Sequence, residues 1–463
     1  MPYPNTARLN NIAQITISQQ PGAALTPNLI GFSIEISQLC SMLKLARTNT
    51  SYVQYYKNLG RSILRIGGNS VDSSIWVPQG QKSCALDPNN SQQRTIITRQ
   101  MVEQLFTFAR KIHWQVIWGL NLVENDPTST ADEAAWVTRL GGSHLLGFTI
   151  GNEPELYAQR GLRPGWWDEQ HFQYEWSQYI TSIRHRVKAK FVGPEACCTT
   201  PLFKNFLEDE APETIGISSH HLYAISNTIT GSAPPTIPLL LSATTLQEEE
   251  TLLDQWSDEA SAADISLALT EVNSASGGGV VGVSNTMAAA LWADDLLFQA
   301  ATHSIRSVDF HNTTGASYNA FSVDGQVTPL YYGLLLFHYA TNQTRWLQSS
   351  IQYVNQQPQN ISAYALMHAD GRSSVFVINK ESTQSTTIQL TVMPDNQVTH
   401  TYTHATIISL AASSISATSG ITLGNRTFSA AGTWTPQMTP IPISHNTASL
   451  TINAGSAAFI TLS

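Results

Sequence analysis

Residues 145–154, LLGFTIGNEP, run from an apolar segment directly into a polar turn that carries a carboxylate. The mostly apolar stretch Leu145–Ile150 is typical of a short strand buried on both faces, as in a parallel sheet. Gly151 and Pro154 form turns readily, so they mark the end of this strand. The sequence therefore predicts a strand that presents Asn152 and Glu153 at its carboxyl end.

Seven further apolar runs of this kind occur before residue 340, separated by stretches with helical periodicity. The predicted strands are 31–36, 62–67, 114–122, 191–193, 215–219, 265–270 and 307–310. The clearest predicted helices are 95–112, 130–140, 168–188, 246–263, 285–303 and 328–339. Eight strand–helix units in a row predict a (β/α)8 TIM barrel, of the α/β class.

The pattern changes after residue 345, where side chains alternate between apolar and polar and helical periodicity is lost. The alternating runs are 362–368, 374–379, 386–392, 401–410, 448–452 and 457–462. They predict an antiparallel β-sandwich. Residues 11–18 alternate in the same way, so we expect them to join it. The predicted domains are a barrel at 26–342 and a discontinuous β-sandwich formed by 7–25 plus 343–463.

The composition excludes several classes of protein. The 463 residues carry only 12% charged side chains and a net charge of −9, so the basic surface of a nucleic-acid binder is absent. No apolar run approaches the roughly 18–20 residues of a membrane span. We expect a monomer with no membrane or nucleic-acid partner. The sparse charge favours secretion, but residues 1–4, MPYP, lack signal-peptide features, so a cytoplasmic location stays open.

Two glutamates stand at the ends of predicted barrel strands, where barrel enzymes place their active sites. Glu153 ends the fourth strand and Glu271 ends the seventh, so both face one barrel mouth. Glycoside hydrolysis needs such a pair, one carboxylic acid to protonate the departing oxygen and one ionised carboxylate to attack or shield the anomeric carbon. A strand-end glutamate can instead serve only to pair with a neighbouring cation. The combination of two glutamates with Asn152 favours the catalytic interpretation.

This constellation resembles the retaining (β/α)8 glycoside hydrolases, and four motifs narrow the resemblance to family 79, that of microbial β-glucuronidases and heparanase. The motifs are GFSIE at 31–35, LRIGGNS at 64–70, IGNEP at 150–154 and YYGLLLF at 331–337. The resemblance implies that Glu153 is the acid/base, Asn152 holds the sugar 2-hydroxyl, and Glu271 is the nucleophile. It implies an exo-acting enzyme that releases β-linked glucuronic acid and needs no cofactor or metal.

The family also suggests how the sugar is held. By resemblance, Tyr223, Tyr318 and the main chain at Ser317–Tyr318 hold the sugar carboxylate, while Glu35 and Asp87 receive other hydroxyls. Arg65 is expected to brace the site's carboxylates, and no other strand-end cation is available for the substrate. Family members carry a further tyrosine just after the nucleophile, where this chain has Ser276. That departure leaves room for another β-linked sugar or for a 4-O-methylated glucuronate.

Two alternatives stay open at this point. Residues 277–282, GGGVVG, fit the G-x-G-x-x-G pattern of dinucleotide enzymes, but they fall in the seventh strand–helix unit rather than the first. A non-catalytic carbohydrate-binding protein on the same barrel is disfavoured because both glutamates are kept.

The leaving group is set by the loops at 78–88, 161–167 and 226–238, and Trp166 and Trp167 either stack on it or cover a helix start. Cys40 and Cys84 are far enough apart to pair, whereas Cys197 and Cys198 are adjacent.

Overall fold

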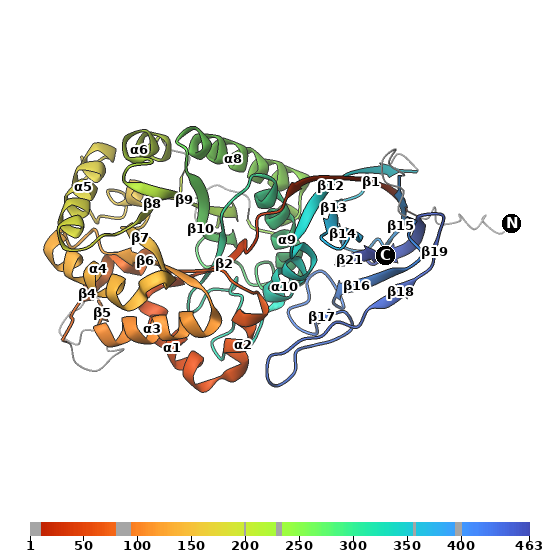
Figure 1. Cartoon of the computed structure of the whole chain (residues 1–463), viewed down its shortest axis with the longest axis horizontal. Coiled ribbons are helices and arrows are strands. Elements are labelled where there is room, and N and C mark those ends of the chain that lie inside the picture. Colours follow the sequence, from red (N-terminus) through yellow and green to blue (C-terminus); the bar gives the residue numbers. More distant parts are fainter. Residues whose placement is uncertain (1–10, 80–93, 199–200, 228–233, 355–357, 394–400) are drawn as a thin grey trace.

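The structure is a computed structural model that describes residues 11–79, 94–198, 201–227, 234–354, 358–393 and 401–463. It consists of a closed parallel barrel and a β domain beside it (Figure 1). The barrel strands run in the order β10-β11-β2-β3-β6-β7-β8-β9. Their bounds are β2 Ile30–Glu35, β3 Ile63–Gly67, β6 Gln115–Leu120, β7 Leu145–Ile150, β8 Phe191–Ala196, β9 Ile215–Ile225, β10 Ser266–Ala275 and β11 Val308–Asn312. The predicted fold class is confirmed.

Helices pack around the barrel and cover the outer faces of its strands (Figure 1). They are α1 Leu39–Thr48, α2 Thr50–Asn58, α3 Arg99–Ile112, α4 Pro127–Gly141, α5 Glu169–Arg186, α6 Leu202–Glu210, α7 Ile237–Leu240, α8 Ala243–Ala262, α9 Met287–Thr302 and α10 Pro329–Thr341. Several begin at a side-chain cap, such as Thr98 for α3 and Asp168 for α5. Four of them, α1, α2, α6 and α7, went unpredicted.

The helix predicted over 95–112 is wrong in its first turn. Residues Thr95–Ile97 form β5, which pairs with β4, Ser74–Trp76, in a small two-stranded sheet outside the barrel. Thr98 then caps α3 by accepting the N–H of Met101. The three β-branched residues at 95–97 are the local cause, because such side chains favour strands over helices.

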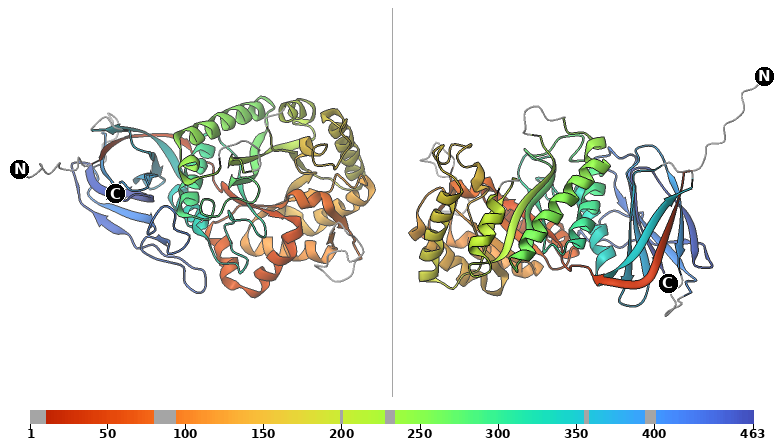
Figure 2. Two further views of the ribbon diagram at one scale, coloured as in Figure 1. Left: turned by 180° about the vertical axis from the view of Figure 1, so that it is seen from behind. Right: turned by 90° about the horizontal axis from the view of Figure 1, so that it is seen from above.

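Among the described residues, the second domain is one continuous sheet of eleven strands in the order β17-β16-β21-β14-β13-β12-β1-β15-β20-β19, with β18 paired to β16. Figure 2 shows it curling into a layer of its own beside the barrel. Its strands are β1 Ile12–Ala24, β12 Thr344–Tyr353, β13 Ile361–His368, β14 Ser373–Asn379, β15 Thr386–Val392, β16 Ala405–Ala411, β17 Thr422–Leu423, β18 Thr439–Ile441, β19 Ile443–Ser444, β20 Thr447–Ile452 and β21 Ser456–Leu462.

The sheet is mixed rather than wholly antiparallel, because β1 runs antiparallel to β12 but parallel to β15. This arrangement follows from the chain path. The first strand of the molecule lies in the second domain, and the chain then leaves to build the whole barrel before it returns through β12. Residues 12–24 and 344–353 are therefore neighbours in space although the barrel separates them in sequence.

Helices α9 and α10 lie between the barrel and the sheet (Figure 1). The ring of Phe298 on α9 stacks on Tyr364 of β13 with centroids 4.1 Å apart. The first two N–H groups of α9 donate to the carbonyls of Ala417 and Ile415 at 2.8 and 2.9 Å. One hydrophobic core thus extends from the barrel across α9 and α10 into the sheet. Helices α9 and α10, which follow the barrel strands β10 and β11, therefore pack against the sheet domain.

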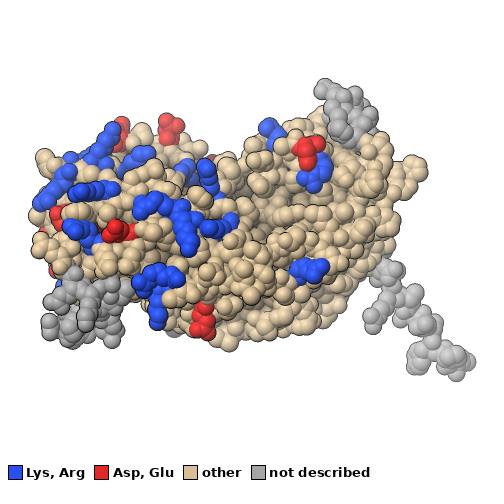
Figure 3. Space-filling model, turned by 60° about the horizontal axis from the view of Figure 1, so that its bottom comes forward, with Lys and Arg blue, Asp and Glu red and all other residues tan. Residues whose placement is uncertain are grey.

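Charged side chains are unevenly spread over the surface. On the face shown in Figure 3 they gather over the barrel, with Lys and Arg prominent, while the sheet domain is almost without charge. Among the helices of the described residues, none is both long and apolar enough to cross a membrane.

Candidate active site

Arg65 is the centre of the polar cluster at the carboxyl ends of the barrel strands. Its side chain is fully buried, and it forms ion pairs with Glu195 and, at 2.7 Å, with Glu271. It also donates to Asn152 Oδ1 at 2.6 Å and to Ser33 Oγ at 2.9 Å. Burial disfavours its charge, but the two carboxylates outweigh burial and raise the pKa of Arg65. One permanently charged guanidinium therefore contacts four side chains, from β2, β8, β10 and the turn after β7.

Two glycines let the chain pass close to this cluster. A side chain on Gly67 would meet the Arg65 guanidinium at 2.7 Å from Cβ, and one on Gly68 would meet the Glu35 carboxyl at 2.4 Å. Gly68 also has a φ of 74°, in the left-handed region that favours glycine. The two glycines of the LRIGGNS motif are thus explained by close approach and backbone conformation.

Glu271 lies on β10 and is held by donors on both oxygens. Arg65 contacts Oε2, and the hydroxyl of Tyr223 on β9 donates to Oε1 at 2.7 Å. Burial alone would raise the pKa of Glu271, but the positive charges of His311, His221 and Arg65 outweigh burial and lower it. The carboxyl is therefore ionised over the ordinary pH range.

Glu153 follows β7 and has different partners. Its Oε1 lies 2.9 Å from His221 Nδ1, and its Oε2 forms an ion pair with Arg160. Its backbone is left-handed, with a φ of 54°, and its N–H donates to the carbonyl of Glu195 at 3.0 Å. Non-glycine residues in this conformation cost on the order of 1 kcal/mol and are concentrated at functional sites. The strand end is bent so that this carboxyl faces the barrel mouth.

His221 connects the two halves of the site. Its Nδ1 contacts Glu153, and its Nε2 lies 3.3 Å from Glu195 Oε2. Burial would lower the pKa of His221, but the carboxylates of Glu271, Glu153 and Glu195 raise it to about 10. For Glu195, burial is outweighed by Arg65 and His221, which lower its pKa to about 2. His221 is therefore an imidazolium at neutral pH, and Glu195 a carboxylate.

The two predicted catalytic glutamates come together. One carboxylate oxygen of Glu153, one of Glu271 and one ring nitrogen of His221 lie within 4.8 Å of one another. Both glutamates are almost fully buried, at 6% and 4% exposure, so the geometry is set by packed strand ends rather than by free side chains.

Two of the predicted sugar ligands are fixed by the same cluster. Glu35, at the end of β2, accepts the N–H groups of Asn69 and Ser70 at 3.2 and 2.9 Å. Burial acts to raise the pKa of Glu35, but His311, 3.5 Å away, lowers it overall. Asn152 is oriented through both ends of its amide, by Arg65 at Oδ1 and by donation to Asn69 Oδ1 at 3.1 Å.

The residues predicted to bind the sugar carboxylate also have contacts with other residues of the protein. The Tyr223 hydroxyl donates to Glu271, so it braces this glutamate in the structure. The rings of Tyr318 and Tyr223 lie 6.1 Å apart between centroids, and only 3% of Tyr318 is exposed. The N–H of Ser317 donates to Gly278 O at 2.7 Å, so a main-chain donor at this place is left to Tyr318. Asp87 and part of the 78–88 loop lie outside the described residues.

The loop around the glycine run forms its own turn. Gly278 accepts from Ser317, and Ser276 Oγ accepts the N–H of Asn227 at 3.0 Å. Helix α9 begins only at Met287, so the glycine run does not open a helix as a dinucleotide-binding loop does.

Trp167 is buried and stacks on Tyr157, whereas Trp166 is 67% exposed. The two tryptophans therefore differ, and only Trp166 is available to a ligand.

Four residues of the site received no role from the sequence. Glu195 lies two residues after the predicted strand 191–193, His221 and His311 follow the predicted strands 215–219 and 307–310, and Arg160 comes from the loop after β7. The first three had a signal, since each stands where barrel strands deliver their functional residues. Arg160 had none, because it lies in a loop, whereas the search for cations considered only the strand ends, where Arg65 was found. Its side chain is one-third exposed.

Comparison with known proteins gives a consistent result. Residues 363–459 match the model of the glycosyl hydrolase family 79 C-terminal beta domain. Two β-glucuronidases are similar in sequence, from Aspergillus niger at 25% identity over 63% of this chain and from Neurospora crassa at 23% over 83%. The family model and the two relatives support the resemblance to glycosyl hydrolase family 79. Its match spans 59% of the length of the Aspergillus protein and 78% of that of the Neurospora protein.

Solved structures agree on the fold of this chain. A 4-O-α-L-rhamnosyl-β-D-glucuronidase from Fusarium oxysporum 12S superimposes with a TM-score of 0.80 at 19% identity, over 96% of this chain and all of that one. An arabinofuranosidase of family 51 from Xanthomonas axonopodis pv. citri gives 0.66 at 14% identity, over 98% of this chain and all of that one. At these identities the likeness establishes the arrangement of barrel and sheet domain.

Proposed function

We propose that this chain is a retaining exo-β-glucuronidase, which releases terminal β-linked glucuronic acid or its 4-O-methyl ether by double displacement. The observation that carries the proposal is the spacing of Glu153 and Glu271, whose nearest oxygens lie within 4.8 Å together with His221. Retaining enzymes hold their two carboxyl groups about 5–5.5 Å apart, whereas inverting enzymes leave about 6.5–9.5 Å for a water molecule.

Glu271 is the proposed nucleophile. Attack requires an ionised carboxylate with a fixed orientation. Arg65 and Tyr223 hold one oxygen each, and the neighbours His311, His221 and Arg65 lower the pKa of Glu271. Double displacement then proceeds through a covalent glycosyl-enzyme ester on Glu271.

Glu153 is the proposed acid/base. In the first step it gives a proton to the departing oxygen, and in the second it takes one from the water that releases the sugar. His221 and Arg160 hold its two oxygens, so the carboxyl is oriented before substrate binds. Asn152, immediately before it, is the proposed ligand of the sugar 2-hydroxyl.

The preference for glucuronate is supported by the two similar β-glucuronidases and by neutral donors near Glu271. In this proposal the Tyr318 hydroxyl and N–H contact the sugar carboxylate, and Glu35 receives a hydroxyl. Hydrogen bonds to a charged group contribute about 1.5–3 kcal/mol each, so two such donors suffice to select an acidic sugar over a neutral one.

A panel of 4-nitrophenyl β-glycosides tests the proposal, with the glucuronide, glucoside, galactoside and xyloside compared by kcat/KM. The glucuronide should be hydrolysed fastest, and the double variant Glu153→Gln/Glu271→Gln serves as the inactive control. A faster glucoside would move the assignment to another exo-β-glycosidase on the same scaffold. That second candidate is favoured by one observation, the serine at 276 in place of the family tyrosine. No hydrolysis of any of them would favour a carbohydrate-binding protein.

A further inference from the structure

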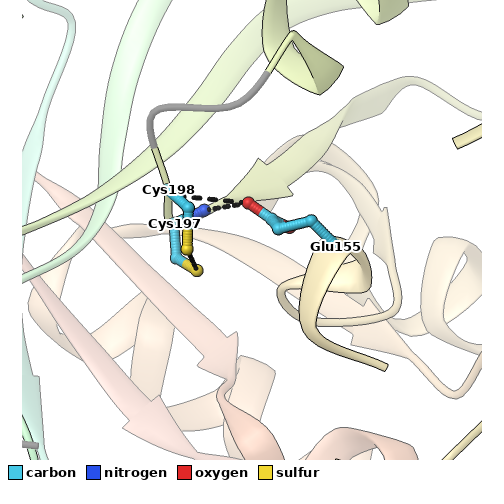
Figure 4. Close-up of side chains that lie close together, drawn as sticks. All are labelled: Glu155, Cys197 and Cys198. Carbon is cyan, nitrogen blue, oxygen red and sulfur yellow. Dashed lines mark hydrogen bonds between the residues drawn. The ribbon is translucent and has the colours of Figure 1, made fainter. Parts of the chain in front are cut away.

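Two adjacent cysteines stand beside the acid/base turn. Cys197 and Cys198 directly follow β8, and their sulfurs are 2.7 Å apart. Glu155 faces them from the short 3-10 turn Pro154–Leu156, two residues after Glu153 (Figure 4). The three side chains thus come from the loops after neighbouring strands β7 and β8. None of them has a part in the proposed hydrolysis.

The carboxylate of Glu155 is held in place by the backbone of the cysteines. Its Oε1 accepts the N–H of Cys197 at 2.7 Å and that of Cys198 at 3.2 Å (Figure 4). Its Oε2 is buried and has no hydrogen-bond partner among the described residues. An anchored carboxylate with one unused buried oxygen is the state expected of a ligand that is positioned before its ion arrives.

The arrangement suits a thiophilic cation. One carboxylate oxygen and the two sulfurs lie within 4.8 Å of one another, and all three residues are partly exposed, so an ion can reach them. Thiolates with a carboxylate select zinc-like ions over Mg²⁺ or Ca²⁺, which require oxygen ligands. Two sulfurs bound to one tetrahedral ion at about 2.3 Å stand about 3.8 Å apart, so side-chain rotation must separate them by about 1 Å.

We propose that Cys197, Cys198 and Glu155 form a binding site for a zinc-group divalent cation, with both sulfurs and one carboxylate oxygen as ligands. Three protein ligands leave the fourth position of a tetrahedral ion open, for water or a small anion. The site is independent of the proposed glucuronidase activity, since it shares none of its residues.

The test is a titration of the full chain, metal-free and kept reduced with a phosphine, with Cd²⁺ as a spectroscopic probe and Zn²⁺ as competitor. A 1:1 thiolate-to-cadmium charge-transfer band should appear in the ultraviolet with a Kd of about 10 μM or tighter, and Zn²⁺ should abolish it. Because the chain has four cysteines, thiols are counted before each run in the wild type and in the Cys197→Ser/Cys198→Ser variant. A difference of two establishes that Cys197 and Cys198 are reduced, and circular dichroism shows that each variant is folded.

Variants assign the ligands. Cys197→Ser and Cys198→Ser should each weaken binding at least about tenfold, and the double variant should lose the band. Glu155→Gln should weaken Cd²⁺ binding about tenfold. Glu208→Gln, an exposed glutamate 3.8 Å from Lys204, is the matched control and should bind as the wild type does. A band that survives in the double serine variant, or its absence from the wild type, would overturn the site, and a wild-type Kd in Glu155→Gln would remove the carboxylate from it.

Discussion

The carboxylate of Glu271 is surrounded by strand-end side chains, whereas that of Glu153 is held partly by an arginine from a partly exposed loop. On the Glu271 side, Arg65 is fully buried and Tyr223 comes from the neighbouring strand. On the Glu153 side, Arg160 is one-third exposed. The difference matches the two proposed roles. A nucleophile must stay ionised in one position, whereas an acid/base meets a leaving group that changes from one substrate to another.

The largest expected effect on kcat/KM comes from replacing the two glutamates, and it should differ between them. Glu271→Gln should reduce kcat/KM on the order of 10⁴-fold or more for every substrate, because no ester can form. Glu153→Gln should be nearly as harmful for an alkyl glucuronide but much less so for a 2,4-dinitrophenyl one, whose leaving group needs no proton. Rates across a series of leaving groups provide the measurement. Equal sensitivity of both variants to leaving-group pKa would contradict the division of roles.

His221 contacts both Glu153 and Glu195, and its charge predicts that the stability of the fold depends on pH. Its folded pKa of about 10 lies above the ordinary value near 6.5, so the folded state binds an extra proton between these values. The stability that His221 contributes is complete below pH 6.5 and is lost as pH rises through 10, by at most about 1.4 kcal/mol per unit. Urea unfolding at pH 7 and 9 should show this loss in the wild type and a smaller one in His221→Gln. Identical losses would mean that His221 is neutral in the fold.

The two tyrosines near Glu271 should behave differently. Tyr223→Phe removes a donor to the nucleophile, so it should slow glucuronide and glucoside alike, by roughly ten- to a hundredfold. Tyr318→Phe should slow hydrolysis of the glucuronide by a similar factor and affect the glucoside less. The proposed hydrogen bond from Tyr318 goes to the sugar carboxylate, which the glucoside lacks. The measurement is kcat/KM on the matched pair of substrates. An equal loss in Tyr318→Phe would exclude its hydroxyl from carboxylate recognition.

The smallest effect concerns the loop on the Glu153 side. Arg160 is partly exposed beside the proposed proton donor, so we expect it to favour anionic leaving groups. Arg160→Gln should slow a glucuronide with a carboxylate on its aglycone about fivefold relative to a neutral one, as expected of an ion pair worth about 1 kcal/mol. Arg163→Gln is the matched control, because Arg163 lies in the same loop but pairs with Glu175 at 2.7 Å. If both variants discriminate equally, Arg160 has no special role at the leaving group.

The sequence predicted much of this arrangement, for identifiable reasons. Barrel strands are buried on both faces and leave continuous apolar runs, so all eight were recognised and their ends located Glu153 and Glu271. The parallel pairing of β1 with β15 was not predictable, because alternation within 11–18 shows that a strand exists but not which neighbour it takes.

The partners inside the site were harder to predict than its carboxylates. Whether Tyr223 contacts the substrate or Glu271 depends on side-chain directions that spacing along the chain does not contain. Arg160 lies in a loop whose path is set by turns, including the positive φ of 70° at Gly161, rather than by periodicity. Glu195 was hidden because the apolar run before it is only three residues long, although β8 continues to Ala196.

Trapping a covalent intermediate tests most directly whether Glu271 is the nucleophile of a retaining enzyme. A 2-deoxy-2-fluoro β-glucuronide with a good leaving group should inactivate the chain with release of one equivalent of aglycone. Mass spectrometry of the digested protein should then find the 2-fluoroglucuronyl group esterified to Glu271. Attachment to Glu153 or Glu195, or steady turnover with inversion of the anomeric centre and no covalent adduct, would contradict the account.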